Sequence, residues 1–562
     1  MNLRPYQESA VKAVIKGLDS GISRQLLVLA TGTGKTNIVA SLVGTLKDRL
    51  PGQSLFLAHR LELIEQAAHR LQVYNPTLKI DVDMGSRVAD ANADVIVASV
   101  ATLGRAGSSR RDRFNWERIT KLYQDEAHLS AASSFKSIFE HGGFLAEDSK
   151  KLLLGVTATP SRGDGKALAE LYQRIVYTYG LRDAITDGWL VDVRGLKVNT
   201  RTSLDGVKTV AGDFDAGQLR DTVNTPERNQ LAVKAWMNNA EGRQTIAFTA
   251  GIQHAKDLAQ AFSAVGIQAE AVWGDDSDRE DKITRLKTGE IRVITNDSIL
   301  TTGFDLWTIG CILMARPSKS SIYFSQCLGR STRLQEGTGN LLEAIANGVD
   351  PLKRDCLLID LVDNSSRHSL VTLPTLLGLN AKMDLKGKSL VGSLQTIEAA
   401  QKEYPHLDLS GLEDIDNVKA YVESVNLFDI KLPTEVQNNS EMSWHRAAAG
   451  GFIIILPNKE SLRIQQNAMD KWEMTAIIAG QKYAGVRDTL EEAFHAADDL
   501  LIGKCPSVVK LVKQKATWHQ DTVTEGQMKM LKRLFKGRQI PADMTKGRAS
   551  QLIGAALAGK EK

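Results

Sequence analysis

The amino-acid sequence predicts an α/β fold with two tandem parallel-sheet lobes, followed by a C-terminal α+β accessory region. Over residues 1–195, short apolar runs alternate with stretches whose apolar residues recur at helical spacing. This alternation is typical of parallel strands that are covered by helices on both faces. It stops in a polar, turn-rich crossing at 196–225 and resumes over 226–372, which predicts the second lobe.

The first lobe contains several apolar runs of strand length. Residues 25–30 form one of them, and a glycine-rich loop and a helical stretch follow it. Further buried strands are predicted at 54–58, 95–98 and 152–156. A strand is also expected at 119–124, although this run is less apolar than buried strands usually are.

The second lobe repeats the pattern without a second glycine-rich loop. Strands are predicted at 245–248, 291–294, 311–314 and 356–360, and a helix is predicted at 252–264. One nucleotide site is therefore expected in the whole chain.

After residue 372 the sequence changes character. We expect a helical connector at 373–440, a small α+β domain at 441–503 and a basic helical unit at 504–562. Within the small domain, a strand is predicted at 451–456 and a helix at 489–502. The last unit holds 13 Lys or Arg against 4 Asp or Glu, a net charge of +9, which indicates contact with a polyanion or a solvated helical face.

Composition describes an ordinary globular protein. The 562 residues are 43% hydrophobic and 24% charged, which excludes a disordered chain. The first residues lack the apolar segment of a leader, and no apolar run reaches membrane-spanning length, so no membrane partner is expected. The four cysteines are scattered and form no Cys-x-x-Cys pair, which argues against a zinc finger and a disulfide framework and predicts a cytoplasmic location.

The glycine-rich loop, Thr31-Gly-Thr-Gly-Lys35-Thr36, lies between a predicted strand and a predicted helix. Its glycines allow backbone N–H groups to turn toward a phosphate, and the helix N-terminus adds positive potential. Lys35 is expected to reach the β- and γ-phosphates, and the Thr36 hydroxyl to bind Mg²⁺. The general phosphate-loop pattern has a further glycine where this chain has Leu29. The predicted nucleotide contacts in this loop are Thr31, Gly32, Thr33, Gly34, Lys35 and Thr36.

An acidic motif, Asp125-Glu-Ala-His128, follows the run at 119–124. Nucleotide hydrolysis needs one carboxylate to hold the metal and a second to polarise the attacking water. We assign Asp125 to Mg²⁺ and Glu126 to the general-base role. His128 is expected to link the nucleotide to the second lobe.

A third motif, Gln326-x-x-Gly329-Arg330-x-x-Arg333, lies in the second lobe. Its two arginines are three residues apart and would share one face if this segment is helical. A guanidinium is always charged and forks onto phosphate oxygens, so these arginines suit the γ-phosphate. By themselves they would be interpreted as surface arginines. Arginines supplied by the other lobe would couple hydrolysis to lobe closure.

Together, the three motifs resemble those of superfamily 2 helicases and translocases of the DEAH-box type. Asp125-Glu-Ala-His128 and the motif at 326–333 match the family's second and sixth motifs, and Gly155-Val-Thr157-Ala-Thr159-Pro160 matches its third. The family tolerates the missing glycine at Leu29. The resemblance covers about residues 1–370 and is nearest to the group of RadD, XPB and the motor subunits of type I and III restriction enzymes.

This resemblance implies two RecA-like lobes and a set of residue roles. Arg4 and Gln7 would recognise adenine. Gln326, Arg330 and Arg333 would face the γ-phosphate, with Lys35, Asp125 and Glu126 as the other catalytic residues. His128, Thr157 and Thr159 would transmit the nucleotide state. Gly303 and Asp305 would line the nucleotide. The residues implied to contact one nucleic-acid strand are Arg60, Ser99, Thr102, Thr249, Asn296 and Thr301.

The expected function is an ATP- and Mg²⁺-dependent nucleic-acid motor. The resemblance favours single-stranded or branched DNA in repair, replication or recombination, with RNA as an open alternative track. Two further alternatives are the motor subunit of a restriction or defence complex and an ATP-switched assembly factor that does not unwind processively. A GTPase is excluded because Asn458-Lys459-Glu460 is followed by Ser461 where guanine recognition needs Asp.

The C-terminal third, which resembles accessory regions of bacterial and phage helicases, leaves room for a protein partner. It also contains four aromatic residues among cations, which suit either base stacking or the core of a small β-containing fold. These residues are Trp444, Trp472, Tyr483 and Trp518.

Overall fold

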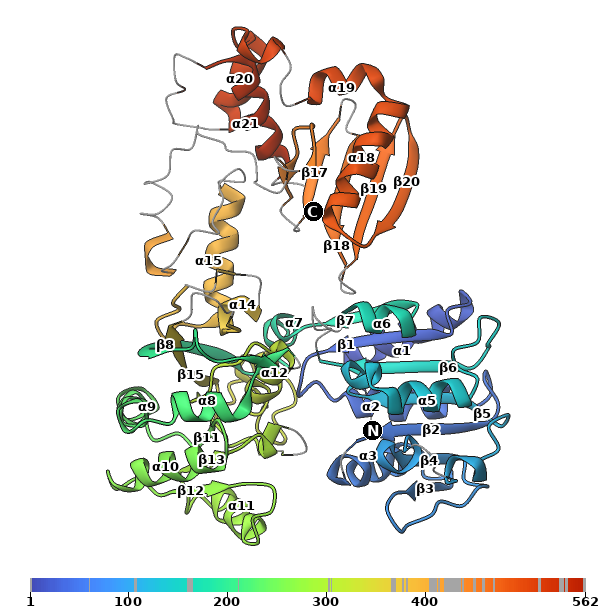
Figure 1. Ribbon diagram of the computed structural model, residues 1–562, viewed down its shortest axis with the longest axis vertical. Coiled ribbons are helices and arrows are strands. Elements are labelled where there is room, and N and C mark those ends of the chain that lie inside the picture. The colour runs from blue at the N-terminus through green and yellow to red at the C-terminus, as the bar shows by residue number, and fades with distance from the viewer. Residues whose placement is uncertain are drawn as a thin grey trace. The chain divides into compact units, whose positions relative to one another are not determined.

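The structure, a computed structural model, divides into two compact units, residues 1–391 and 392–562 (Figure 1). The residues that it describes are 3–59, 61–105, 109–158, 165–210, 212–301, 304, 306–364, 370–376, 379–380, 383–403, 412, 415–418, 436, 439–447, 451–456, 460–467, 471–513, 517–534, 540 and 544–558. Within these ranges, no helix is both long enough and apolar enough to span a membrane.

The first unit contains two parallel sheets, and the first of these has seven strands in the order β3-β4-β2-β5-β6-β1-β7. These strands are β1 (Arg24–Leu29), β2 (Gln53–Ala58), β3 (Ile80–Asp83), β4 (Val95–Ser99), β5 (Ile119–Asp125), β6 (Leu152–Thr157) and β7 (Arg174–Tyr179). The helices of this lobe are α1 (Pro5–Asp19), α2 (Lys35–Thr45), α3 (Leu61–Tyr74), α4 (Val100–Leu103), η1 (Arg111–Arg113), η2 (Ala127–Ala131), α5 (Ser133–His141), α6 (Gly165–Leu171) and α7 (Leu181–Thr186). All of the predicted strands of this lobe are present.

Strand β5 lies inside the first sheet although it carries Lys121. The Lys121 side chain is buried, and its ammonium donates hydrogen bonds to the backbone carbonyls of Leu50 and Gly52. Burial lowers the pKa of Lys121 to about 8. Two backbone carbonyls thus compensate for a cation that is buried inside the sheet.

The second sheet has six strands in the order β12-β13-β11-β14-β15-β8. These strands are β8 (Asp192–Ser203), β11 (Thr245–Phe248), β12 (Ala269–Val272), β13 (Val293–Asn296), β14 (Cys311–Met314) and β15 (Asp355–Asn364), with a separate hairpin of β9 (Thr209–Val210) and β10 (Asp213–Phe214). The helices of this lobe are α8 (Ala216–Val223), α9 (Pro226–Asn239), α10 (Ile252–Ser263), α11 (Arg279–Lys287), η3 (Ile299–Thr301), α12 (Ser321–Leu328), α13 (Leu341–Ala346) and α14 (Leu373–Leu376).

The boundary between the lobes differs from the predicted one. Strand β8 begins at Asp192 and pairs in parallel with β15, so the second sheet takes residues that we expected in the first lobe and in the crossing at 196–225. The rest of the expected crossing holds the β9–β10 hairpin and α8. The chain therefore passes between the sheets over the few residues that separate α7 from β8.

The second unit is built on a five-stranded antiparallel sheet in the order β16-β17-β18-β19-β20. Its strands are β16 (His445–Arg446), β17 (Phe452–Ile455), β18 (Ser461–Gln466), β19 (Trp472–Ile478) and β20 (Gln481–Arg487). The helices are α15 (Leu390–Glu403), which spans the unit boundary, η5 (Ile415–Asn417), α18 (Leu490–Lys504), α19 (Pro506–Val512), η7 (Thr517–Gln520), α20 (Glu525–Leu534) and α21 (Lys546–Ala558).

The small domain and the basic unit were predicted separately, but they share one body. Helix α21 packs against β16 and β17, and α19 packs against α18. The predicted helix at 489–502 is α18, and the Thr489 side chain caps it by accepting a hydrogen bond from the Glu492 N–H. Such a capping box fixes the first turn of a helix.

Candidate functional site

The glycine-rich loop connects the end of β1 to the start of α2, as the phosphate-binding interpretation requires. Gly32 and Gly34 have φ of 89° and 75°, a left-handed conformation that a glycine adopts without strain. The Lys35 ammonium and the Thr31 hydroxyl are buried, and neither has a hydrogen-bond partner among the residues that the structure describes. A buried cation without a partner is costly, and a bound phosphate would satisfy it.

The N-terminal segment, Arg4 to Gln7, holds this loop through hydrogen bonds to its backbone. The Gln7 amide and the Tyr6 hydroxyl both donate hydrogen bonds to the Thr33 carbonyl, at 2.9 and 2.6 Å. The Gln7 amide oxygen accepts from the Arg4 N–H at 3.0 Å. A Cβ on Gly34 would lie 2.7 Å from the Gln7 amide nitrogen, so the loop and the segment fit together only with glycine there.

The acidic motif lies at the end of β5, with both carboxyl groups within the electrostatic reach of Lys35. Burial and the neighbouring Glu126 raise the pKa of Asp125. For Glu126, burial acts in the same direction but is outweighed by the positive charge of Lys35, the hydrogen bond with His128 and the charge of Arg330, so its pKa is lowered. Two adjacent carboxyl groups with divergent pKa values suit the separate roles of metal ligand and base.

His128 connects the acidic motif to Thr157 at the end of β6. Its Nδ1 atom is 3.3 Å from the Glu126 carboxylate and 3.4 Å from the Thr157 hydroxyl, and Thr157 is buried. The strands approach closely here, because a Cβ on Gly155 would lie 2.8 Å from the Cβ of Ala127. These contacts lie within the first lobe, and the predicted link from His128 to the second lobe stays a prediction.

The third motif lies at the C-terminal end of α12 and contacts the glycine-rich loop. A Cβ on Gly329, which caps α12, would lie 2.4 Å from the Cβ of Thr31. A Cβ on Gly32 would lie 3.6 Å from the Cγ of Arg333. Burial lowers the pKa of Arg333 to about 10, so this arginine stays charged at neutral pH. The structure thus brings the first and third motifs together, although about 300 residues separate them.

Arg330 has different surroundings from Arg333. It is buried, and its guanidinium donates hydrogen bonds to the backbone carbonyls of Thr301 and Phe304. Its charge also acts on Glu126. Arg330 therefore holds the backbone at Thr301 and Phe304 in addition to acting on the acidic motif. Gln326, one turn earlier on α12, is also buried.

Several residues that were assigned to the nucleic-acid strand have buried side chains that bond within their own lobe. Thr249 and Asn296 are fully buried, and their side chains donate to the carbonyls of Asn296 and Ala247. The Thr301 hydroxyl donates to the Ser298 carbonyl. These three residues shape the loops at the carboxyl edge of the second sheet, and in this structure they do not present a polar group to a strand.

In the first lobe, Ser99 is buried and precedes α4 as its N-cap residue. The Thr102 hydroxyl on α4 is partly exposed and accepts a hydrogen bond from the Gly85 N–H at 3.3 Å. Other assigned residues lie outside the part of the chain that the structure describes. These are Arg60, Thr159, Gly303 and Asp305.

The magnesium assignment to Thr36 and Asp125 needs a nucleotide to complete the ligand set. Among the residues that the structure describes, no group of three or more His, Cys, Asp or Glu is placed to hold a metal by itself. Hard oxygen ligands from one carboxylate, one hydroxyl and the phosphates are the usual set for Mg²⁺ at such sites. The orphaned Lys35 ammonium and the left-handed glycines show that the loop fits a nucleotide phosphate.

Sequence analysis missed the short segment 187–191 that precedes β8. The Leu190 side chain would lie 3.2 Å from a Cβ on Gly32, and Trp189 lies beside Arg4 and Tyr6. No motif marks these residues, and only the left-handed Gly188 gives a local signal of a turn.

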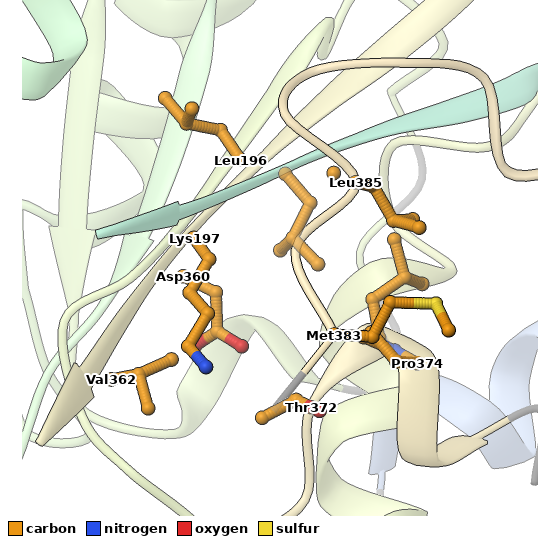
Figure 2. A pocket seen from close by; sticks show the side chains of 11 residues that line it. Leu196, Lys197, Asp360, Val362, Thr372, Pro374, Met383 and Leu385 are labelled. Carbon is orange, nitrogen blue, oxygen red and sulfur yellow. The ribbon is translucent and has the colours of Figure 1, made fainter. Parts of the chain in front are cut away.

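The second lobe also contains a small cavity (Figure 2). None of the residues that line it belongs to the candidate ATP site. The Lys197 ammonium lies beside the Asp360 carboxylate in Figure 2, and burial together with Asp363 raises the pKa of Asp360 to about 7. The volume of this cavity, about 20 Å³, is enough for a single water molecule and too small for a nucleotide. It results from the packing of Leu373 and Leu385 over β8.

The base-stacking interpretation of the C-terminal aromatic residues is wrong for Trp444. This side chain is fully buried, its Nε1–H donates to the Ser440 hydroxyl at 3.0 Å, and its ring meets Phe494 edge-on. Trp472 and Tyr483 pack against the same core. Trp518 lies under the Lys546 ammonium, 5.7 Å from the ring centroid.

Three protein families match consecutive parts of the chain. Residues 1–162 match "Type III restriction enzyme, res subunit", and residues 227–335 match "Helicase conserved C-terminal domain". Residues 420–562 match "Mitochondrial helicase Irc3, C-terminal domain". The last match extends the family relationship to the C-terminal third, which sequence analysis had compared only with accessory regions of bacterial and phage helicases.

Relatives cover both units. "Putative ATP-dependent helicase IRC3" of Saccharomyces cerevisiae is 30% identical over 529 residues, which is 84% of this chain and 74% of that protein. "Putative mitochondrial ATP-dependent helicase irc3" of Schizosaccharomyces pombe is 35% identical over 386 residues, 68% of this chain and 60% of that protein. An Escherichia coli protein, "Type I restriction enzyme EcoAI endonuclease subunit", is 25% identical over 60% of this chain and 45% of its own length. The extent of the first match, together with the phosphate loop and the helicase lobes, shows that the chain belongs to the Irc3 family of ATP-dependent helicases within superfamily 2.

Proposed function

We propose that this helicase uses DNA as its track and hydrolyses MgATP between Lys35, the Asp125–Glu126 pair and the arginines of the third motif. One observation carries the site assignment. The Lys35 ammonium, which has no hydrogen-bond partner in the part of the chain that the structure describes, acts on both carboxyl groups, while Gly329 of the second lobe abuts the same loop at Thr31. A nucleotide bound at this loop would therefore meet residues of both lobes.

Each residue then has a role that its surroundings support. Lys35 would hold the β- and γ-phosphates, and Thr36 and Asp125 would hold Mg²⁺, which neutralises phosphate charge when bound. Glu126, with its lowered pKa, stays ionised and would accept a proton from the attacking water. Arg333 would supply positive charge at the phosphates, and Arg330 would hold the adjoining loop in place.

The choice of DNA is supported by the relatives. The E. coli relative is named as a subunit of a type I restriction endonuclease, and a relative from Sulfurisphaera tokodaii, 23% identical over 389 residues, is named "DNA 3'-5' translocase XPB2". Ser99 and Thr102, at the carboxyl end of β4, are the described first-lobe residues that we assign to the strand. Such backbone contacts weaken as salt rises and carry no base sequence information.

The decisive variant is Glu126→Gln, which keeps the size of the side chain and removes the base. We expect MgATP binding to persist while DNA-stimulated turnover falls by about 10²- to 10⁴-fold, as for other losses of a general base. Glu280→Gln, an exposed position on α11, is the matched control and should hydrolyse ATP normally. Turnover of Glu126→Gln close to that of the unchanged protein would remove Glu126 from the site.

The track is tested with the unchanged protein. ATPase rates are compared with single-stranded DNA, duplex DNA, forked DNA and RNA of equal length, with a strand-displacement assay on the forked substrate. Stimulation by RNA alone would contradict the proposal. Stimulation by DNA without displacement or translocation would favour the ATP-switched assembly factor.

A second candidate is a motor subunit of a restriction or defence complex, which the family match over 1–162 favours. Cleavage would then need a partner chain. Duplex DNA that stimulates ATP hydrolysis more than forked DNA, with no strand displacement, would support this candidate over the first.

The compartment is a separate proposal. Three of the four free cysteines are buried, and free thiols fit the cytoplasm, as the sequence predicts. The S. pombe relative is named as mitochondrial, and the same thiols fit that compartment equally well. Imaging of the tagged full-length chain in its own cells distinguishes the two.

A further inference from the structure

The five residues Asp187–Val191 connect α7 of the first lobe to β8 of the second, and they contact the phosphate loop, the N-terminal segment and the third motif. We propose that this segment, here called the connector, positions the third motif against the phosphate loop, with Leu190 as its central residue. The inference rests on the proposed ATP site. It adds the segment that holds the phosphate loop of the first lobe and the third motif of the second lobe in position against each other.

The first contact of the connector is with the third motif. The Val191 N–H donates a hydrogen bond of 2.8 Å to the Thr332 carbonyl. Thr332 is buried and lies between Arg330 and Arg333 in the chain. The position of this carbonyl therefore sets the path of the backbone between the two arginines, and Val191 is the residue that holds it.

The second contact is with the turn that follows the third motif. The Leu341 N–H donates to the Gly188 carbonyl at 2.8 Å, and the Asn340 amide donates to the Asp187 carbonyl at 2.6 Å. Gly188 has φ of 75°, and a Cβ there would lie 2.7 Å from the Asn340 Oδ1 and 3.0 Å from the Leu342 nitrogen. Only glycine allows this approach, so the connector is fixed to the second lobe at two places.

The third contact is with the nucleotide side. Leu190 is 1% exposed, and its Cδ2 would lie 3.2 Å from a Cβ on Gly32 of the phosphate loop. Trp189 lies under the Arg4 guanidinium, 4.8 Å from the ring centroid, and meets Tyr6 edge-on at 5.9 Å. Tyr6 in turn holds the Thr33 carbonyl.

The connector thus packs against the phosphate loop through side chains and against the third motif through backbone hydrogen bonds. It offers no group to the chemistry, so its role is positioning. Because misplacement by about 1 Å costs about 10²-fold in turnover at an assembled site, a loosened connector should lower kcat. ATP affinity should change little, since Lys35 and the loop glycines remain in place.

The test compares Leu190→Ala and Leu190→Met in the full chain, with ATP hydrolysis measured with and without single-stranded DNA. For Leu190→Ala we expect DNA-stimulated kcat to fall by about 10- to 100-fold, with KM for ATP within about threefold. Leu190→Met has nearly the volume of leucine and should restore kcat to within about threefold. Leu154→Ala, a fully buried residue of β6, is the control for lost core packing.

A second variant separates the connector from folding. Asn340→Asp keeps the side-chain oxygen that accepts from the Leu342 and Glu343 N–H groups and so caps α13, but it removes the N–H that reaches Asp187. We expect kcat to fall while Tm stays near that of the unchanged protein. Asn347→Asp places the same charge at the exposed end of α13 and should not affect kcat.

The outcomes are distinct. If the unchanged protein hydrolyses ATP without responding to nucleic acid, the proposed function fails. If the unchanged protein responds, the inference fails by itself when Leu190→Ala and Asn340→Asp both keep their kcat. It also fails when Leu190→Ala loses kcat only in proportion to Tm, as Leu154→Ala does.

Discussion

At position 329 the chain has room for a hydrogen atom and nothing larger. A Cβ there would lie 2.4 Å from the Thr31 Cβ and 2.5 Å from its Cγ, distances that no relaxed pair of carbon atoms adopts. Gly329 is not in a left-handed conformation, since its φ is −61°. The need for glycine here is therefore one of contact between the third motif and the phosphate loop.

Gly329→Ala should consequently force α12 away from Thr31. We expect ATP turnover to fall by about 10-fold or more, because Arg333 moves with the backbone, while the chain remains folded. Phosphate release and far-ultraviolet circular dichroism measure the two effects. Gly274→Ala is the control, since no atom lies within 4 Å of a Cβ at that position. An alanine variant at 329 with normal turnover would show that the two motifs do not touch during hydrolysis.

The two arginines of the third motif were equivalent in the sequence and are not equivalent in the structure. The Arg330 guanidinium donates hydrogen bonds to the carbonyls of Thr301 and Phe304, whereas the aliphatic part of the Arg333 side chain lies beside Gly32. Spacing alone placed both on one helical face. The difference arises because the carbonyls of Thr301 and Phe304, some 30 residues earlier in the chain, accept hydrogen bonds from Arg330. The spacing of the two arginines carries no information about these acceptors.

At the scale of secondary-structure elements, the strands that could be predicted are the inner ones. Strands β3 and β7 end the first sheet, and β12 and β8 end the second; none of these four was predicted. These edge strands are less buried than the inner ones, since only Tyr179 of β7 is buried and the first two residues of β12 are partly exposed. A search for continuous apolar runs detects strands that are covered on both faces and overlooks the edges.

Strand β5 gives a prediction that depends on pH. The ordinary pKa of lysine in an unfolded chain is about 10.4, and burial lowers that of Lys121 to about 8. Between these values the unfolded chain binds more protons than the folded chain, so this group makes stability rise as pH increases from 8 to 10. Lys121→Met removes the titratable ammonium group and therefore the part of the pH dependence of stability that this group causes.

The measurement is urea unfolding of both proteins at pH 7, 8, 9 and 10. The free energy of unfolding of the unchanged protein should rise relative to that of Lys121→Met above pH 8, by at most about 1.4 kcal/mol per pH unit. Below pH 8 the difference should be constant, because Lys121 is then charged in both states. A difference that does not change with pH would mean that the Lys121 ammonium keeps its ordinary pKa.

At the scale of the whole molecule, the ATP site could be predicted because its chemistry is written in short motifs. Lys35 and Asp125–Glu126 each follow a strand of one parallel sheet, and carboxyl ends of such strands meet at one edge. The connector at 187–191 could not be predicted, because its hydrogen bonds to the second lobe use backbone groups and no sequence motif marks the side chains of Trp189 and Leu190. At Gly188, the close approach of Asn340 and Leu342 requires glycine.

The two units have separate cores, and this predicts that they are separable. A cluster built around Trp444, Phe494 and Leu462 lies wholly within the second unit, between residues 436 and 512. The described ATP-site residues lie in the first unit. We therefore expect a fragment of residues 1–391 to hydrolyse ATP with basal kcat within about threefold of the full chain, since its site loses no residue.

The matching fragment, residues 392–562, should unfold cooperatively in urea, and Trp444 provides the sharper test. Removing a fully buried aromatic side chain costs about 3–5 kcal/mol, so Trp444→Ala should unfold this fragment at low denaturant or leave it unfolded. Ile477→Ala, which is 41% exposed on β19, is the control and should change the unfolding free energy by less than about 0.5 kcal/mol. In the full chain, Trp444→Ala should leave basal ATP hydrolysis unchanged. Loss of hydrolysis in that variant, with the first unit still folded, would mean that the second unit contributes to the ATP site and that the division at residue 391 is not a functional one.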